Sequence, residues 1–92
     1  MDFECRKTEN CLADSQIYEY KLPITVREFK IHLNGWTVEE NHRYRRPMMI
    51  AMNRGLQIKG ILDRYIITVR FPEDTYSEAK MFFEAWLKNE EN

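Results

Sequence analysis

The chain has 92 residues, a net charge of −1 and only three glycines and three prolines, while 43% of its residues are hydrophobic. This length predicts one domain, residues 1–92, which should bury about 60–65% of the surface that the unfolded chain exposes. The composition excludes a low-complexity or disordered chain, and no apolar run has the length of a signal peptide or of a membrane span. We therefore expect a cytoplasmic protein with no membrane partner.

The N-terminal segment contains one clear strand. Residues 1–15 are polar with scattered apolar positions, which leaves two alternatives, a partly disordered segment or a first strand. Within residues 17–22, aromatic and aliphatic side chains alternate at period two, a pattern that predicts a half-buried strand. Pro23 should end this strand, since proline cannot donate a backbone hydrogen bond.

A short first helix follows. Thr25 and Glu28 have the spacing of a capping box, in which each side chain accepts a hydrogen bond from an otherwise unpaired helix N–H. Gly35 is a natural stop. At 100° per residue, one face of this helix carries Val26, Phe29 and Leu33. Residues 36–41 fit either a short strand or a connection.

The centre of the chain reads as a three-stranded meander closed by a helix. The expected strands and loops are strand 46–52, loop 53–55, strand 56–62, loop 63–64 and strand 65–71. The first loop ends in a glycine, which can adopt the left-handed conformation that such a loop needs.

The side chains of the meander can be assigned to the two faces of the sheet by counting residue pairs outward from these loops. The expected core face carries Met48, Ile50, Met52, Leu56, Ile58, Leu62, Tyr65, Ile67, Val69 and Phe71. The opposite face carries Arg43, Arg45, Met49, Ala51, Gln57, Lys59, Ile61, Ile66, Thr68 and Arg70. A one-residue slip in register would exchange the two faces, so this assignment depends on the loops.

The last segment predicts an amphipathic helix. It should begin at Asp74 or Thr75, and Thr75 and Glu78 are spaced as a second capping box. An arc of about 140° on its wheel carries apolar side chains: Tyr76, Ala79, Phe82, Phe83, Trp86 and Leu87. The expected fold is therefore α+β in the order β-α-β-β-β-α. It consists of an antiparallel meander, three strands or four to five with N-terminal strands, and two helices on one face.

Charge is distributed unevenly along the chain. Residues 1–40 carry a net charge of −3, residues 41–70 carry +6 and residues 71–92 carry −4. The basic segment 42–70 opens with the sequence His-Arg-Tyr-Arg-Arg. Arginine can hold two phosphate oxygens and tyrosine can stack on a base, which indicates nucleic-acid binding. The alternative is that these cations balance the acidic ends, within one molecule or across an oligomer.

Two observations favour a protein partner over nucleic acid. The pI of about 6.1 is below the range typical of nucleic-acid-binding domains, and the expected open face has no aromatic platform for bases. Apolar side chains on that face, flanked by cations, resemble an interface with an apolar centre and a charged rim. The partner-binding residues predicted in this way are Arg43, Tyr44, Arg45, Arg46, Met49, Lys59, Ile61, Ile66 and Arg70.

Catalytic and metal-binding patterns are weak. Cys5, Cys11, His32 and His42 lack the spacing of a zinc site. The two cysteines could pair, but they are too few for a disulfide scaffold, so we expect reduced thiols. We expect no cofactor. A metal-free ribonuclease that uses His42, Tyr44 and the nearby arginines for acid–base work and charge stabilisation remains an alternative. The leading hypothesis is a non-enzymatic binding protein of the regulator, inhibitor or immunity type, which docks onto a macromolecule. A protein is the expected partner; nucleic acid bound by residues 42–70, or a second copy of the chain, are the alternatives.

Overall fold

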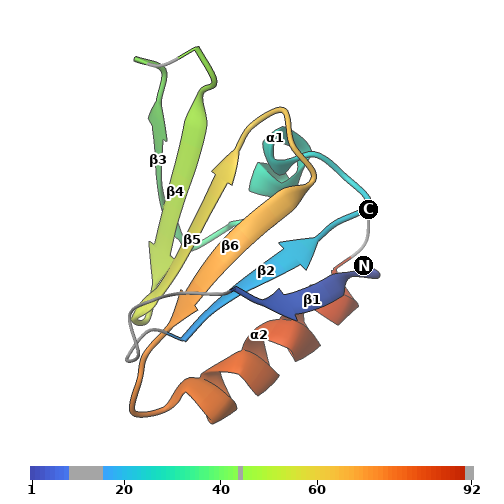
Figure 1. The fold of residues 1–92 in the computed structure, drawn as a ribbon, viewed down its shortest axis with the longest axis vertical. Helices are drawn as coiled ribbons and strands as arrows, with labels where there is room; N and C mark the ends of the chain where they lie inside the picture. The colour runs from blue at the N-terminus through green and yellow to red at the C-terminus, as the bar shows by residue number, and fades with distance from the viewer. Residues whose placement is uncertain (9–15, 44, 91–92) are drawn as a thin grey trace.

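The computed structural model describes residues 1–8, 16–43 and 45–90, which form one antiparallel sheet and two α-helices (Figure 1). The six strands lie in the order β1-β2-β6-β5-β4-β3. The elements in chain order are β1 (Glu4–Lys7), β2 (Gln16–Lys21), α1 (Val26–Phe29), the 3₁₀ turn η1 (Lys30–His32), β3 (Thr37–Asn41), β4 (Met48–Asn53), β5 (Leu56–Ile61), β6 (Ile66–Phe71) and α2 (Tyr76–Asn89). The α+β class is confirmed. The predicted order and the three-stranded meander are not matched exactly, because the sheet continues on both sides.

The additional strands come from the two segments whose structure the sequence left open. The segment from Glu4 to Lys7 pairs with β2, and β2 pairs with β6, so the N-terminal strands extend the meander on one side. The remainder of the segment that we expected to be partly disordered, residues 9–15, lies outside the described residues. On the other side, Thr37–Asn41 pairs with β4 and forms the second edge of the sheet.

The first helix forms as its capping pattern predicts. The Thr25 hydroxyl accepts a hydrogen bond from the Glu28 N–H at 3.3 Å, and the Glu28 carboxylate accepts one from the Thr25 N–H at 3.2 Å. Both of the expected reciprocal bonds are therefore present. The helix is shorter than expected, since after Phe29 the chain tightens into η1. Its expected inner residues are buried: Val26, Phe29 and Leu33.

The β4–β5 turn overturns the predicted face of β4. Asn53 pairs with Leu56, so the turn has two residues instead of the expected three. Arg54 and Gly55 have φ values of 50° and 83°, the positive sign that a type I′ hairpin turn requires at both positions. Shortening the loop by one residue moves every β4 side chain to the opposite face. Met49 and Ala51 are therefore in the core at 0% exposure, and the core positions predicted for Met48, Ile50 and Met52 are wrong.

The turn conformation predicts a stabilising substitution. A left-handed conformation costs an L-residue with a Cβ roughly 1–2 kcal/mol, and asparagine tolerates it better than arginine. Arg54→Asn should therefore raise the free energy of unfolding by about 0.5–1 kcal/mol, measured by urea denaturation. The opposite sign is expected for Gly55→Ala, because the new Cβ would lie 3.2 Å from Pro72 Cγ at a φ of 83°. A destabilised Arg54→Asn variant would contradict this account of the turn.

The faces predicted for β5 and β6 are those observed. Ile58, Ile67, Val69 and Phe71 are buried beneath the helices, together with Leu62 just after β5. Tyr65 is the exception: it is 50% exposed because it lies in the β5–β6 turn, ahead of the first residue of β6.

α2 contributes two fully packed side chains to the core. Phe83 and Leu87 are 2% and 0% exposed. The Phe83 ring meets Tyr20 edge-on at 5.1 Å and Phe71 at 5.8 Å between ring centroids. These contacts attach the helix to β2 and β6. Among the described helices, none has both the length and the apolar character that a membrane crossing requires.

The rotation of α2 differs from the one that its apolar arc predicts. Phe82 is 77% exposed and Tyr76 is 37% exposed, so their predicted core positions are wrong. On the other side of the helix, Glu84 accepts a hydrogen bond from the buried Tyr20 hydroxyl at 2.9 Å, and Lys80 lies 4.9 Å from the centre of the Tyr18 ring. These polar contacts turn the helix toward β2 and leave Phe82 facing outward.

The N-terminus of α2 lacks the second predicted capping box. Thr75 is the N-cap residue, but its side chain makes no hydrogen bond to the described N–H groups of the first turn. Its φ of −127° and ψ of 24° differ from the extended backbone of Thr25, where φ is −72° and ψ is 161°. An extended N-cap is needed to aim the hydroxyl at the helix, so the Thr75–Glu78 spacing alone does not produce a cap.

A polar cluster joins α2 to the sheet and perturbs two acidic groups. Burial raises the pKa of Tyr20 well above its ordinary value, and its hydrogen bond to Glu84 adds to the increase. Desolvation alone would raise the pKa of Glu84. Hydrogen bonds from Lys80 and Tyr20 outweigh the desolvation and hold the pKa of Glu84 below its ordinary value. The ionised carboxylate and the neutral phenol are therefore the forms that the fold favours.

These shifts predict a stability loss at both ends of the pH range. Because the pKa of Glu84 is lowered on folding, its contribution is present above its ordinary value of 4.5 and is lost as the pH falls. Because the pKa of Tyr20 is raised on folding, its contribution is present below 10.0 and is lost as the pH rises above that value. Urea denaturation at several pH values measures this dependence. Glu84→Gln should reduce the loss of unfolding free energy at acid pH, and Tyr20→Phe should reduce the loss at alkaline pH. The same pH dependence in wild type and both variants would contradict the cluster's role.

Candidate docking surface on the open face of the sheet

All six strands contribute side chains to the face of the sheet that points away from α1 and α2, here called the open face. Residues that are paired across neighbouring strands form three rows on this face. The row nearest the β4–β5 turn consists of Thr37, Met52, Gln57, Arg70 and Ile17. The middle row consists of Glu39, Ile50, Lys59, Thr68, Glu19 and Arg6. The third row consists of Asn41, Met48, Ile61, Ile66, Lys21 and Glu4. The fully buried strand residues belong to the other face, so no described helix covers this one.

The centre of the open face is apolar. Met48, Ile50 and Met52 project from β4, next to Ile61 on β5 and Ile66 on β6. Met52 and Ile66 are 44% and 43% exposed. A shallow hollow of about 420 Å³ lies over this centre, lined by Met48, Ile61 and Ile66 together with Lys59, Gly60, Arg64 and Thr68. Contiguous apolar side chains on an uncovered sheet face are typical of a contact surface.

Charged side chains of both signs border the apolar centre, since Glu4, Glu19 and Glu39 share the open face with the cations. Four of the cations form no ion pair with any described residue: Lys21, Lys59, Arg64 and Arg70. By contrast, Arg6 at the β1 edge pairs with Glu19 at 2.8 Å. The surplus positive charge of the central segment is therefore partly displayed on this face and is not wholly neutralised by the acidic ends of the same molecule.

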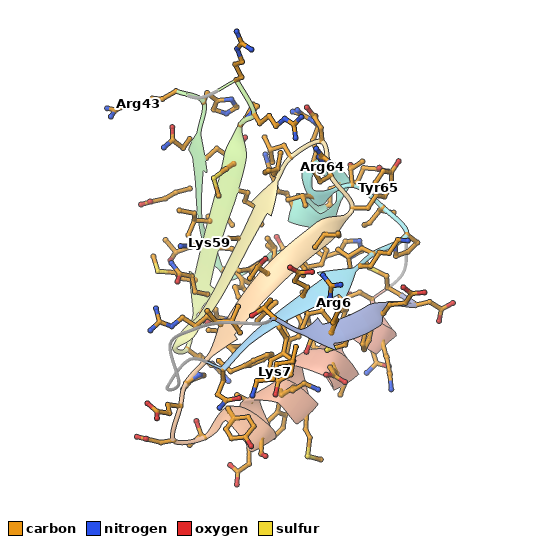
Figure 2. All side chains as sticks on the ribbon, in the orientation of Figure 1. Arg6, Lys7, Arg43, Lys59, Arg64 and Tyr65 are labelled. Atoms are coloured by element: carbon orange, nitrogen blue, oxygen red, sulfur yellow. The ribbon has the colours of Figure 1, made fainter. Side chains whose placement is uncertain are left out.

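A second group of arginines lies at one end of the sheet, in the connection from β3 to β4. Arg43, Arg45 and Arg46 are exposed there, and the Arg43 N–H donates to the Asn41 side chain at 3.0 Å. Figure 2 shows Arg43 at the tip of this connection, and Arg64 and Tyr65 at the neighbouring β5–β6 turn. These arginines extend the basic surface beyond the open face and do not lie on it.

The predicted partner-binding residues thus separate into three groups. Lys59, Ile61, Ile66 and Arg70 lie together on the open face. Arg43, Arg45 and Arg46 lie at the end of the sheet, and Tyr44 lies outside the described residues. Met49 is at 0% exposure in the core and cannot contact a partner, which corrects its assignment. The cause is the two-residue turn, which also brings Met48, Ile50 and Met52 to the open face. A reading of Arg54-Gly55 as a type I′ turn would have found them.

His42, which the ribonuclease alternative uses, lies beside a carboxylate. His42 Nε2 lies 3.1 Å from Glu40 Oε1, and Glu40 also forms an ion pair with Lys30. The hydrogen bond from Lys30 holds the pKa of Glu40 below its ordinary value. Tyr44 lies outside the described part of the chain. Cys5 is an exposed free thiol, and within residues 1–8, 16–43 and 45–90 no His, Cys, Asp and Glu side chains gather as a metal site.

The open face therefore combines apolar side chains at its centre with unpaired cations around them, on a sheet stiffened by five antiparallel strand pairings. Such a surface can bury apolar groups of a partner and place carboxylates against its cations. Comparison of the chain with protein-family models, with curated proteins and with solved structures found no match.

Proposed function

We propose that this protein is a small non-enzymatic binding module, of the regulator, inhibitor or immunity type, that docks through its open face onto a protein partner. The observation that carries the proposal is the apolar centre of that face, where Met52 and Ile66 are 44% and 43% exposed. Burying exposed apolar surface contributes roughly 25 cal/mol per Å². An interface formed here would bury side chains that already lie on a rigid sheet, which limits the entropy lost on binding.

The charges on the same face define the partner's surface. Lys59 and Arg70 form no ion pair with the described residues, and both flank the apolar centre. A matching partner has an apolar patch bordered by Asp or Glu. Complementary charges accelerate encounter and suppress wrong partners more than they raise affinity.

Nucleic-acid binding is the second candidate, and one observation favours it. Arg43, Arg45 and Arg46 are exposed close together in one connection, beside the turn that carries Arg64 and Tyr65 (Figure 2). Such a group of arginines can contact successive phosphates. Against it, the described open face presents no aromatic side chain on which bases could stack. We therefore place it second.

A matched pair of variants tests the docking proposal. Ile66→Glu puts a carboxylate into the apolar centre, and Met81→Glu puts one on α2 at a position that is 73% exposed. From a nuclease-treated extract of the source cells, wild type and Met81→Glu should capture the same protein, and Ile66→Glu should not. With that protein purified, Ile66→Glu should raise Kd by about tenfold or more. Equal affinity of all three proteins would contradict the proposal.

Salt dependence separates the two candidates. Short single-stranded RNA and duplex DNA should show no saturable binding at about 50 or 200 mM salt if the open face serves a protein partner. Binding at low salt that disappears in an Arg43→Glu, Arg45→Glu variant would establish the nucleic-acid alternative instead.

A second copy of the chain is the remaining candidate partner, and sedimentation tests it. Wild type and Ile66→Glu should both sediment as monomers over a range of concentrations. A dimer of the wild type that is absent in Ile66→Glu would identify the open face as a self-association surface.

A further inference from the structure

A second surface, on the helix-covered side of the sheet, has the shape and chemistry of a small-molecule site. A hollow of about 490 Å³ lies between α2 and the β4–β5 end of the sheet, within the range of known ligand pockets. Its main lining residues are Trp36, Leu56, Ala79, Phe82, Trp86 and Arg54. This hollow lies away from the open face, so a ligand bound here would be separate from the docking partner proposed above.

The aromatic wall of the hollow is held in place by the core. The Trp86 ring packs against Trp36 at 5.8 Å and against the buried Phe83 at 5.6 Å between centroids. It also meets Phe29 of α1 at 6.1 Å. Phe82 belongs to the same lining but is 77% exposed. Because α2 is rotated toward β2, the Phe82 ring lies beside the hollow, and the packed tryptophans form the wall of that hollow.

Among the described residues that line this hollow, Arg54 alone is charged. It makes no ion pair with any described residue, and its φ of 50° is costly for a residue with a Cβ. Neither the core nor the turn requires arginine at this position, since asparagine or glycine would suit the backbone better. Backbone strain at a residue that has no structural role is typical of functional sites.

The lining selects the class of ligand. Flat aromatic walls favour a planar ring, and a guanidinium favours a carboxylate, which it can hold with two parallel hydrogen bonds. Arg54 would repel a cation, so a quaternary ammonium group does not fit these aromatic rings. An extended peptide is also disfavoured, because the bordering strands β4, β5 and β6 each have neighbours on both sides and offer no free edge.

We propose that this hollow binds a small aromatic carboxylate, with its ring against Phe82 and the tryptophans and its carboxylate on Arg54. The amides of Asn34 and Asn53 and the hydroxyl of Thr75, which also line the hollow, supply further hydrogen-bonding groups at its polar side.

Tryptophan fluorescence provides the test, because both tryptophans of the chain line the hollow. The probes are 3-phenylpropanoate and its uncharged analogue 3-phenylpropanamide, titrated into the full-length protein with excitation selective for tryptophan. The acid should bind saturably with a Kd of about 1 mM or lower, and the amide about fivefold more weakly.

Two variants locate the site, and two others serve as controls. Arg54→Asn, which keeps the turn, should abolish the preference for the acid, and Phe82→Ala should weaken both probes by about threefold or more. Met81→Ala is the matched control, because Met81 is 73% exposed on α2 and does not line the hollow; its affinities should equal those of wild type. Ile66→Glu on the open face should also bind normally, so a failure here is distinguishable from a failure of the docking function.

Two results would overturn the proposal. One is the absence of saturable binding of the acid. The other is equal binding of acid and amide in the wild type with no effect of Arg54→Asn or Phe82→Ala, which would mean that the probe does not use this lining.

Discussion

Replacing Phe83 with alanine should lower the free energy of unfolding by about 3–5 kcal/mol, whereas replacing its neighbour Phe82 should change it by less than about 0.5 kcal/mol. The two residues are adjacent and chemically identical, but Phe83 is 2% exposed and Phe82 is 77% exposed. Phe83→Ala removes edge-on ring contacts to Tyr20 and Phe71 and a tilted one to Trp86, and it leaves a cavity at the centre of the α2 interface.

Urea denaturation of both variants, followed by circular dichroism, measures the difference. A loss of this size is a large part of the roughly 5–15 kcal/mol that stabilises a typical domain. Phe83→Ala should therefore unfold at a clearly lower urea concentration with little change in slope. Similar losses in both variants would show that the apolar arc of the helical wheel, and not the rotation described here, sets the buried side of α2.

Substituting alanine for Gly60 should cost about 1–3 kcal/mol through overpacking against the first helix. A Cβ at Gly60 would lie 2.8 Å from Val26 Cγ2 and 3.1 Å from Val26 Cγ1. Val26 cannot easily move aside. Its χ1 is restricted by β-branching, and its N–H donates to the Arg64 carbonyl at 2.8 Å. The neighbouring Arg27 N–H donates to the Leu62 carbonyl at 3.0 Å, which holds the start of α1 against the β5–β6 turn.

A double-mutant cycle isolates this contact. Val26→Ala alone should also destabilise the protein, because it removes buried methyl groups. In the Gly60→Ala background, however, Val26→Ala relieves the clash. The double variant should therefore lose less unfolding free energy than the sum of the two single losses, by about 1 kcal/mol or more. Strict additivity would mean that β5 and α1 are not in the close contact described.

The open face shows how one mispredicted turn changes a predicted docking surface. The predicted interface included Lys59, Ile61, Ile66 and Arg70, and these residues do share one face, because β5 and β6 were placed correctly. Met49 was assigned to the same interface and is in fact in the core. The difference arises from one residue in the β4–β5 turn, since side chains alternate with period two along a strand.

The sequence by itself determined the features that depend on neighbours within a few residues. The capping box of Thr25 and Glu28 and the burial of Val26, Phe29 and Leu33 follow from contacts within one helix or from a short hydrophobic period. The alternation along β5 and β6 likewise identified the buried residues of both strands, and with them the α+β class.

Tertiary structure alone decided the remaining features, because they depend on contacts between distant segments. Glu4–Lys7 and Thr37–Asn41 become strands by pairing with β2 and β4, although their own alternation is weak or absent. The rotation of α2 is set by Tyr20, which bonds to Glu84 across 64 positions of the chain. That rotation exposes Phe82 and opens the aromatic hollow. A helical wheel records which residues are apolar, whereas the sheet beneath the helix decides which of them are buried.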